Sequence, residues 1–148
     1  MMKKYTTAIS IIVTLLFVVT LIVWAKMSQP QSPATVNDSS DIITTKGMHT
    51  HPELTIFVKD EKIEIPQNIG MVGEHKPMHT HDDVPIIHLE YPAKVTKDDT
   101  RLGKFFEVWG KDFYEFGQTV TMTVNGTPNT ELENYLMQDG DKIELRYE

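Results

Sequence analysis

Two copies of the tetrapeptide Met-His-Thr-His lie 30 residues apart in this chain, at 48–51 and 78–81. Alternate residues of an extended strand point to the same face, so each His-Thr-His can aim two imidazoles at one point. Neutral imidazole is a common ligand of zinc, copper and nickel. A further histidine follows in a short apolar run at 86–91. If the two repeats meet in space, the sequence predicts a transition-metal site with the ligands His49, His51, His79, His81 and His88.

Copper and zinc are the two ions that this pattern favours. Met48 and Met78 each precede a repeat, and a thioether is a soft ligand that shifts the preference toward copper. The alternative is that both methionines fill gaps in a small core. The residue before a histidine points to the opposite face of a strand, which supports that alternative.

Acidic residues near the histidines have two readings. Glu53, Asp82 and Asp83 can orient imidazoles through hydrogen bonds or complete a coordination sphere. Turn formation explains Asp82-Asp83 equally well. His75 lies in a polar loop, and we expect it to be solvated rather than a ligand.

Two other functions remain open at this stage. The histidines can be structural or pH-responsive residues of a non-enzymatic interaction module in a membrane complex. A zinc-dependent hydrolase with Glu53 or Asp83 as the base ranks last, because a domain of this size has few residues to line a substrate pocket. We therefore do not expect an enzyme.

Hydrophobic periodicity predicts one short helix after these motifs. Leu102, Phe105, Phe106 and Trp109 follow the i, i+3, i+4, i+7 spacing of a helical stripe. Gly110 fits the end of that helix. The stripe is typical of a core-facing helix rather than of an aromatic binding face. Residues 98–100, Asp-Asp-Thr, are the expected N-cap region.

Alternating apolar residues predict strands on both sides of the helix, at 53–58, 62–65, 86–91, 119–124 and 142–147. Asn125-Gly126 is a strong hairpin turn signal, and 131–137 is expected to form a helical turn. The fold class is therefore α+β, with a small mixed β-sheet packed on one short helix in a β-grasp-like arrangement. The alternative is a small β-sandwich of cupredoxin type, whose copper ligands usually include a cysteine, which this chain lacks.

The N-terminal segment is typical of a membrane-targeting sequence. Lys3 and Lys4 precede an uncharged apolar run at 8–25, and Lys26 follows it. This length and charge pattern predicts a single-pass transmembrane helix at 1–26 with the remaining chain outside the cytoplasm. The alternative is a cleaved signal peptide and a secreted protein. Residues 27–46 are polar and read as a flexible tether, and 47–148 form the expected extracytoplasmic globular domain.

Charge limits the choice of partners. The chain has 21 acidic and 14 basic residues, a formal net charge of −7. Phosphate repulsion opposes nucleic acid binding by such a surface, whereas cations are attracted. The membrane is the expected partner through the N-terminal helix, and the sequence leaves open a protein partner within that membrane.

Three segments together resemble a family of small, membrane-anchored, extracytoplasmic proteins of archaea and bacteria with paired His-x-His motifs and no assigned function. These segments are His49-Thr50-His51, the stretch from His79 to Glu90, and 102–110, which reads Leu-Gly-Lys-Phe-Phe-Glu-Val-Trp-Gly. The resemblance covers about 50–148 and implies a domain outside the cytoplasm. It implies no activity, so the expected chemistry depends on the histidines.

Overall fold

The structure is a computed structural model that describes residues 41–148. The predicted transmembrane helix at 1–26 and residues 27–40 of the predicted tether lie outside the described residues. Within 41–148, no helix has the length and apolar character needed to cross a membrane. This part of the chain combines three β-sheets with short helices, which confirms the α+β class.

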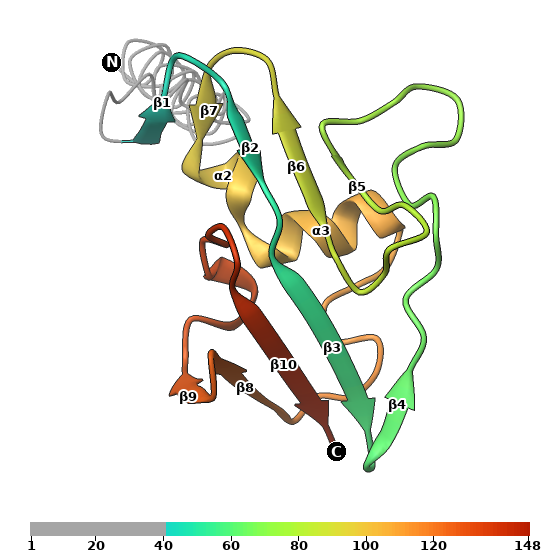
Figure 1. Ribbon diagram of the computed structural model, residues 1–148. Coiled ribbons are helices and arrows are strands. Elements are labelled where there is room, and N and C mark those ends of the chain that lie inside the picture. The colour runs from blue at the N-terminus through green and yellow to red at the C-terminus, as the bar shows by residue number, and fades with distance from the viewer. Residues whose placement is uncertain (1–40) are drawn as a thin grey trace, which may run out of the picture. The chain divides into compact units, whose positions relative to one another are not determined.

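The largest sheet has five strands and mixed direction (Figure 1). Its central strand β10 is parallel to β3 and antiparallel to β8. Leu145 lies opposite Ile56 on one side and Met122 on the other. In spatial order, the strands are β4 (Glu61–Ile63), β3 (Glu53–Val58), β10 (Lys142–Tyr147), β8 (Val120–Val124) and β9 (Thr127–Asn129).

Two short turns close the hairpins at the edges of this sheet. Asn125 and Gly126, with φ of 53° and 78°, connect β8 to β9. Lys59 and Asp60, with φ of 48° and 66°, connect β3 to β4. Positive φ at both central residues matches the right-handed twist of the paired strands. The predicted Asn-Gly turn is confirmed.

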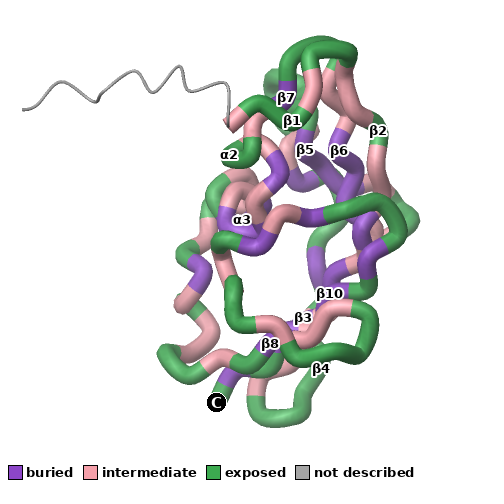
Figure 2. Tube along the Cα trace, turned by 90° about the vertical axis from the view of Figure 1, so that its left-hand side faces the viewer, coloured by how far each residue is buried: buried purple, intermediate pink, exposed green. Residues whose placement is uncertain are grey.

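The hydrophobic core lies between this sheet and helix α3 (Leu102–Trp109). Alternation along β3 and β10 buries one face of each strand, and α3 adds its apolar stripe. Figure 2 shows buried stretches on these elements and on β5 and β6. The principal core side chains are Leu54, Ile56, Leu102, Phe105, Phe106, Ile143, Leu145 and Tyr147.

Helix α3 contains the predicted apolar stripe and ends where predicted, but it begins later than the predicted N-cap region implies. Residues 98–100 belong to a separate turn, α2 (Lys97–Thr100), which Thr96 caps by donating its N–H to the Asp99 carboxylate at 2.8 Å. Arg101 lies between the two helices in an extended conformation, with ψ of 140°, and so separates α2 from α3. At the other end, Gly110 is left-handed with φ of 79°, the C-terminal stop predicted from the sequence.

Two smaller sheets lie beside the large one. β2 (Met48–Thr50), β6 (His88–Tyr91) and β5 (Met78–His79) form a three-stranded antiparallel sheet in that order. β2 leads directly into β3, so the two sheets share one stretch of backbone (Figure 1). β1 (Ile42–Thr44), within the range predicted as tether, pairs with β7 (Val95–Thr96). The expected helical turn at 131–137 contains the 3-10 helix η2 (Leu132–Asn134).

Candidate metal centre

The three-stranded sheet places the two histidine repeats on either side of β6. On β5, His79 lies directly opposite His88. On β2, His49 lies opposite Glu90, two residues along β6 from His88. On β6, Leu89 lies between His88 and Glu90, points to the other face of the sheet and is fully buried. The sheet therefore has one core face and one face that carries histidines, as the alternation of the sequence predicted.

The first group of converging imidazoles, here named the inner trio, consists of His79, His81 and His88. One ring nitrogen from each lies within 4.8 Å of the others. The Nε2 atoms of His79 and His81 are 3.1 Å apart. Two nitrogen ligands of one tetrahedral zinc ion lie about 3.3 Å apart. The inner trio can therefore hold a metal ion after small side-chain movements.

Backbone contacts fix the orientation of His79. Its Nδ1 lies 3.0 Å from the carbonyl oxygen of Lys76. A carbonyl only accepts hydrogen bonds, so Nδ1 carries the proton, and in the neutral ring Nε2 carries the lone pair and faces the other histidines. Burial lowers the pKa of His79, and its histidine neighbours His75 and His81 lower it further, whereas the Lys76 contact acts in the opposite direction. The structure thus favours neutral His79, the form that binds metals.

His88 is oriented by an acidic neighbour. Its Nε2 lies 3.1 and 3.2 Å from the two carboxylate oxygens of Asp83. The hydrogen bond from His88 is the largest cause of the lowered pKa of Asp83, which keeps that carboxylate ionised. Nε2 therefore donates, and in the neutral ring Nδ1 carries the lone pair. Among the described residues this buried Nδ1 has no hydrogen-bond partner. A buried nitrogen without a partner is costly, and a bound ion would satisfy it.

Replacement of Asp83 by asparagine is expected to weaken metal binding by about 10- to 100-fold, because the amide no longer holds His88 in a single tautomer. The affinity for zinc, measured by competition with a chromogenic chelator, checks this expectation. Asp82→Asn is the matched control, since Asp82 is an adjacent exposed carboxyl group. Its affinity should stay within about threefold of the original value. Equal effects of the two substitutions would contradict the role of Asp83.

The second group, here named the outer trio, consists of His49, His51 and His88. Its members also present ring nitrogens within 4.8 Å of one another. The side chains of His49 and His51 are 62% and 41% exposed. Glu90 lies 3.2 Å from Nε2 of His49. Asp139 accepts the backbone N–H of His51 at 2.9 Å. All five predicted ligands therefore belong to one or other trio, and His88 belongs to both.

His75 lies closer to this site than the sequence analysis expected. His75 is exposed, yet its Nε2 lies 3.4 Å from Nε2 of His79. Gly70, with φ of 74°, turns the preceding loop, and its carbonyl accepts the N–H of Lys76 at 2.9 Å. This turn returns His75 to β5. In the sequence, the four-residue spacing between His75 and His79 was the one signal that the two side chains lie close together.

The methionines and the other predicted acidic residues have different surroundings. Met78 is buried in the hydrophobic core, the packing role that the sequence left open. Met48 lines an apolar surface pocket that also includes Met137. Of the acidic residues proposed to orient imidazoles, Asp83 contacts a histidine, and the other carboxylate contacts in the described part come from Glu90 and Asp139, which sequence reasoning missed.

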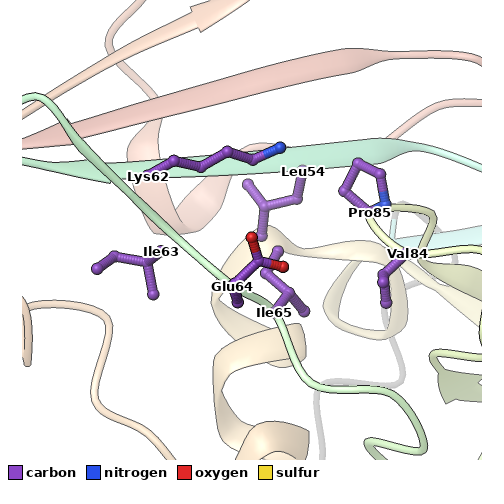
Figure 3. Close-up of a pocket in the computed structure, with 7 residues that line it drawn as sticks. All are labelled: Leu54, Lys62, Ile63, Glu64, Ile65, Val84 and Pro85. Atoms are coloured by element: carbon purple, nitrogen blue, oxygen red, sulfur yellow. The ribbon is translucent and has the colours of Figure 1, made fainter.

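A small pocket lies apart from this chemistry, between the β3–β4 hairpin and the loop before β6 (Figure 3). Its volume of about 30 Å³ is enough for roughly one water molecule. None of its lining residues is a histidine. They are Leu54, Lys62, Ile63, Glu64, Ile65, Val84 and Pro85.

Comparisons of this chain with protein-family models, with curated proteins and with solved structures find no match.

Proposed function

We propose that this protein binds a transition-metal ion at the two histidine trios, whose members are His49, His51, His79, His81 and the shared His88. The observation that carries the proposal is the pair of three-histidine groups that share His88. Two nitrogen atoms support it. Among the described residues, the buried Nδ1 of His88 has no hydrogen-bond partner, and Nε2 of His79 faces only the Nε2 atoms of other histidines.

Zinc and copper are the proposed ions. Zinc is commonly held by nitrogen ligands, and three imidazoles with one open position are a known arrangement for it. Imidazole also suits copper. The core position of Met78 removes much of the sequence-based argument for a thioether ligand. What remains is a nitrogen donor set that favours Zn²⁺ or Cu²⁺ over Cu⁺.

The cellular setting belongs to the same proposal. The apolar segment at 8–25 with its preceding lysines supports a single-pass anchor and a metal site outside the cytoplasm. The role would be to buffer or deliver the ion, rather than to catalyse a reaction. The family resemblance of the three quoted segments is consistent with this setting.

A finer fold assignment accompanies the function. We propose that the five-stranded sheet is a β-grasp sheet, because the strand order β4-β3-β10-β8-β9 has a parallel central pair between two outer hairpins. Helix α3 packs its aromatic stripe against that sheet. In this view the three-stranded sheet that carries the histidines is an addition to the β-grasp core.

Elemental analysis of the full-length chain, purified in detergent without a histidine tag, tests the proposal. We expect close to one zinc or copper ion per chain after incubation with either metal and removal of the excess. The His79→Ala/His81→Ala/His88→Ala variant should retain none. A matched triple variant at exposed acids, Glu61→Gln/Glu64→Gln/Glu131→Gln, separates metal binding at the histidines from general attraction to negative charge. Absence of metal in the original protein would refute the function.

The pH dependence of zinc affinity gives an independent prediction. Protons compete with the metal for imidazole nitrogens, so the apparent zinc affinity should fall as the pH is lowered, by more than about one decade per pH unit at the acid end of the range. Competition titrations between pH 5 and 7.5 measure this slope. A slope close to zero would mean that carboxylates, already ionised throughout this range, hold the ion instead.

The metal-free protein should show a related change in stability. Burial lowers the pKa of His79 in the folded chain below the unfolded value of 6.5. The unfolded chain therefore binds this proton more tightly. The stabilising contribution is complete above pH 6.5 and is lost as the pH falls through the folded pKa. Urea unfolding of the original protein and of His79→Gln across this range detects the difference.

A further inference from the structure

We propose that the outer and inner trios are successive positions of a single ion, which enters at the outer trio and is held at the inner trio. This inference rests on the proposed metal-binding function. It assigns a direction to the site: His49 and His51 receive the ion, and His79 and His81 retain it.

The shared histidine is the reason that one ion occupies one trio at a time. A neutral imidazole has a single lone pair. Nε2 of His88 is already engaged by the Asp83 carboxylate, at 3.1 and 3.2 Å, so this nitrogen does not face a second ion. Within the described part of the chain, Nδ1 is the His88 nitrogen without a hydrogen-bond partner. Completion of one trio thus leaves the other with two histidines.

Exposure distinguishes the two positions. The outer side chain of His49 is 62% exposed, and it is reachable by a donor molecule or by hydrated metal ions. In contrast, His79 has no exposed surface, and its ring is fixed by the Lys76 carbonyl. A ligand that is already oriented loses less conformational entropy on binding. The inner trio is therefore the stronger site, and the outer trio is the more accessible one.

The charges around the outer trio favour the entry of a cation. Glu90 lies 3.2 Å from His49 and 3.8 Å from Nδ1 of His88. Asp139 lies 3.7 Å from Nδ1 of His51. These carboxylates attract a cation from solution. The two acids contact outer histidines, whereas the inner His79 has a backbone carbonyl as its hydrogen-bond partner outside the histidine cluster.

Short distances make the step between the two positions feasible. The ring centroid of His88 is 5.0 Å from that of His51 and 4.7 Å from that of His81. His88 can remain bound while the ion exchanges His49 and His51 for His79 and His81. The ion consequently never returns to full hydration during the transfer.

Zinc exchange kinetics with the full-length chain in detergent test this route. In His49→Ala/His51→Ala, the inner trio remains, so the equilibrium affinity should stay within about threefold of the original value. The rates of zinc uptake from, and release to, a chromogenic chelator should both fall by at least about tenfold, and by the same factor. A merely structural effect on the site would change the affinity instead.

His75→Ala is the matched comparison, because it removes an exposed imidazole that belongs to neither trio. Its exchange rates should stay within about twofold of the original rates. Unchanged rates in His49→Ala/His51→Ala, or slower exchange in His75→Ala alone, would overturn the proposed direction. A large loss of affinity in His49→Ala/His51→Ala would mean that all five histidines hold the ion together.

Stoichiometry provides the second check. Calorimetric titration of the original protein with zinc should show one tight ion per chain. Two tight ions would overturn the inference and point to a bridging His88, while leaving the metal-binding function intact. If the original protein binds no zinc or copper, the proposed function fails as well, so the two failures are distinguishable.

Discussion

His88→Ala is expected to reduce zinc affinity by more than about 100-fold, a larger loss than the 10- to 100-fold typical of residues that only orient a ligand. His88 is the one residue common to the inner and outer trios. Its removal leaves two histidines on each side of β6 and completes neither group. Competition with a chromogenic chelator measures the loss.

Two comparisons isolate this effect from damage to the fold. Circular dichroism and urea unfolding of metal-free His88→Ala should show a folded protein, because the substitution also removes a buried nitrogen that has no hydrogen-bond partner in the described structure. His75→Ala removes a histidine that is a member of neither trio, and this variant should retain nearly all of the affinity. Zinc affinity within tenfold of the original value in His88→Ala would contradict the shared role of this residue.

Phe106→Ala is expected to have the largest effect on stability, a loss of ~3–5 kcal/mol. Phe106 is 1% exposed, and its ring lies 4.9 Å, centroid to centroid, from that of Phe113. Truncation leaves a cavity between α3 and the five-stranded sheet. Urea unfolding with an unchanged slope measures the loss of unfolding free energy.

Phe57→Ala is the matched aromatic control. Phe57 lies on β3, is half-buried and is covered by Arg146 at 4.3 Å from the ring centroid. Its loss should lower the unfolding free energy by about 1 kcal/mol. If Phe106→Ala costs no more than Phe57→Ala, the assignment of α3 as the main core element is wrong. Added zinc should raise the stability of both variants, because it binds the folded chain.

The sequence predicted much of the scaffold because its local signals were strong. The span of α3 follows from an apolar stripe and Gly110, and the span of β10 follows from strict alternation. The break at Arg101 was not predictable from residue types, because Arg101 has no special conformational preference. Its extended conformation depends on packing of α3, whose first residue, Leu102, donates its N–H to the carbonyl of Tyr135 at 2.8 Å.

The sequence predicted which histidines lie together and missed some of their neighbours. Alternation in a strand placed His79, His88 and His49 on one face of the sheet. The proximity of Asp139 to His51 was not predictable, since 88 residues separate them and no local pattern links them. His75 was missed because the Gly70 turn, rather than strand periodicity, determines its position.

The position of β10 at the end of the chain has a consequence for folding during synthesis on the ribosome. β3 finds its parallel partner only after 89 further residues, from Ile56 to Leu145, have been synthesised. β5 and β6 pair across a much shorter stretch, from Met78 to Leu89. Nearby pairings form early and distant ones late. A nascent chain therefore carries all of its histidines before its central sheet can close, and the site acquires its rigid support as one of the last events of folding.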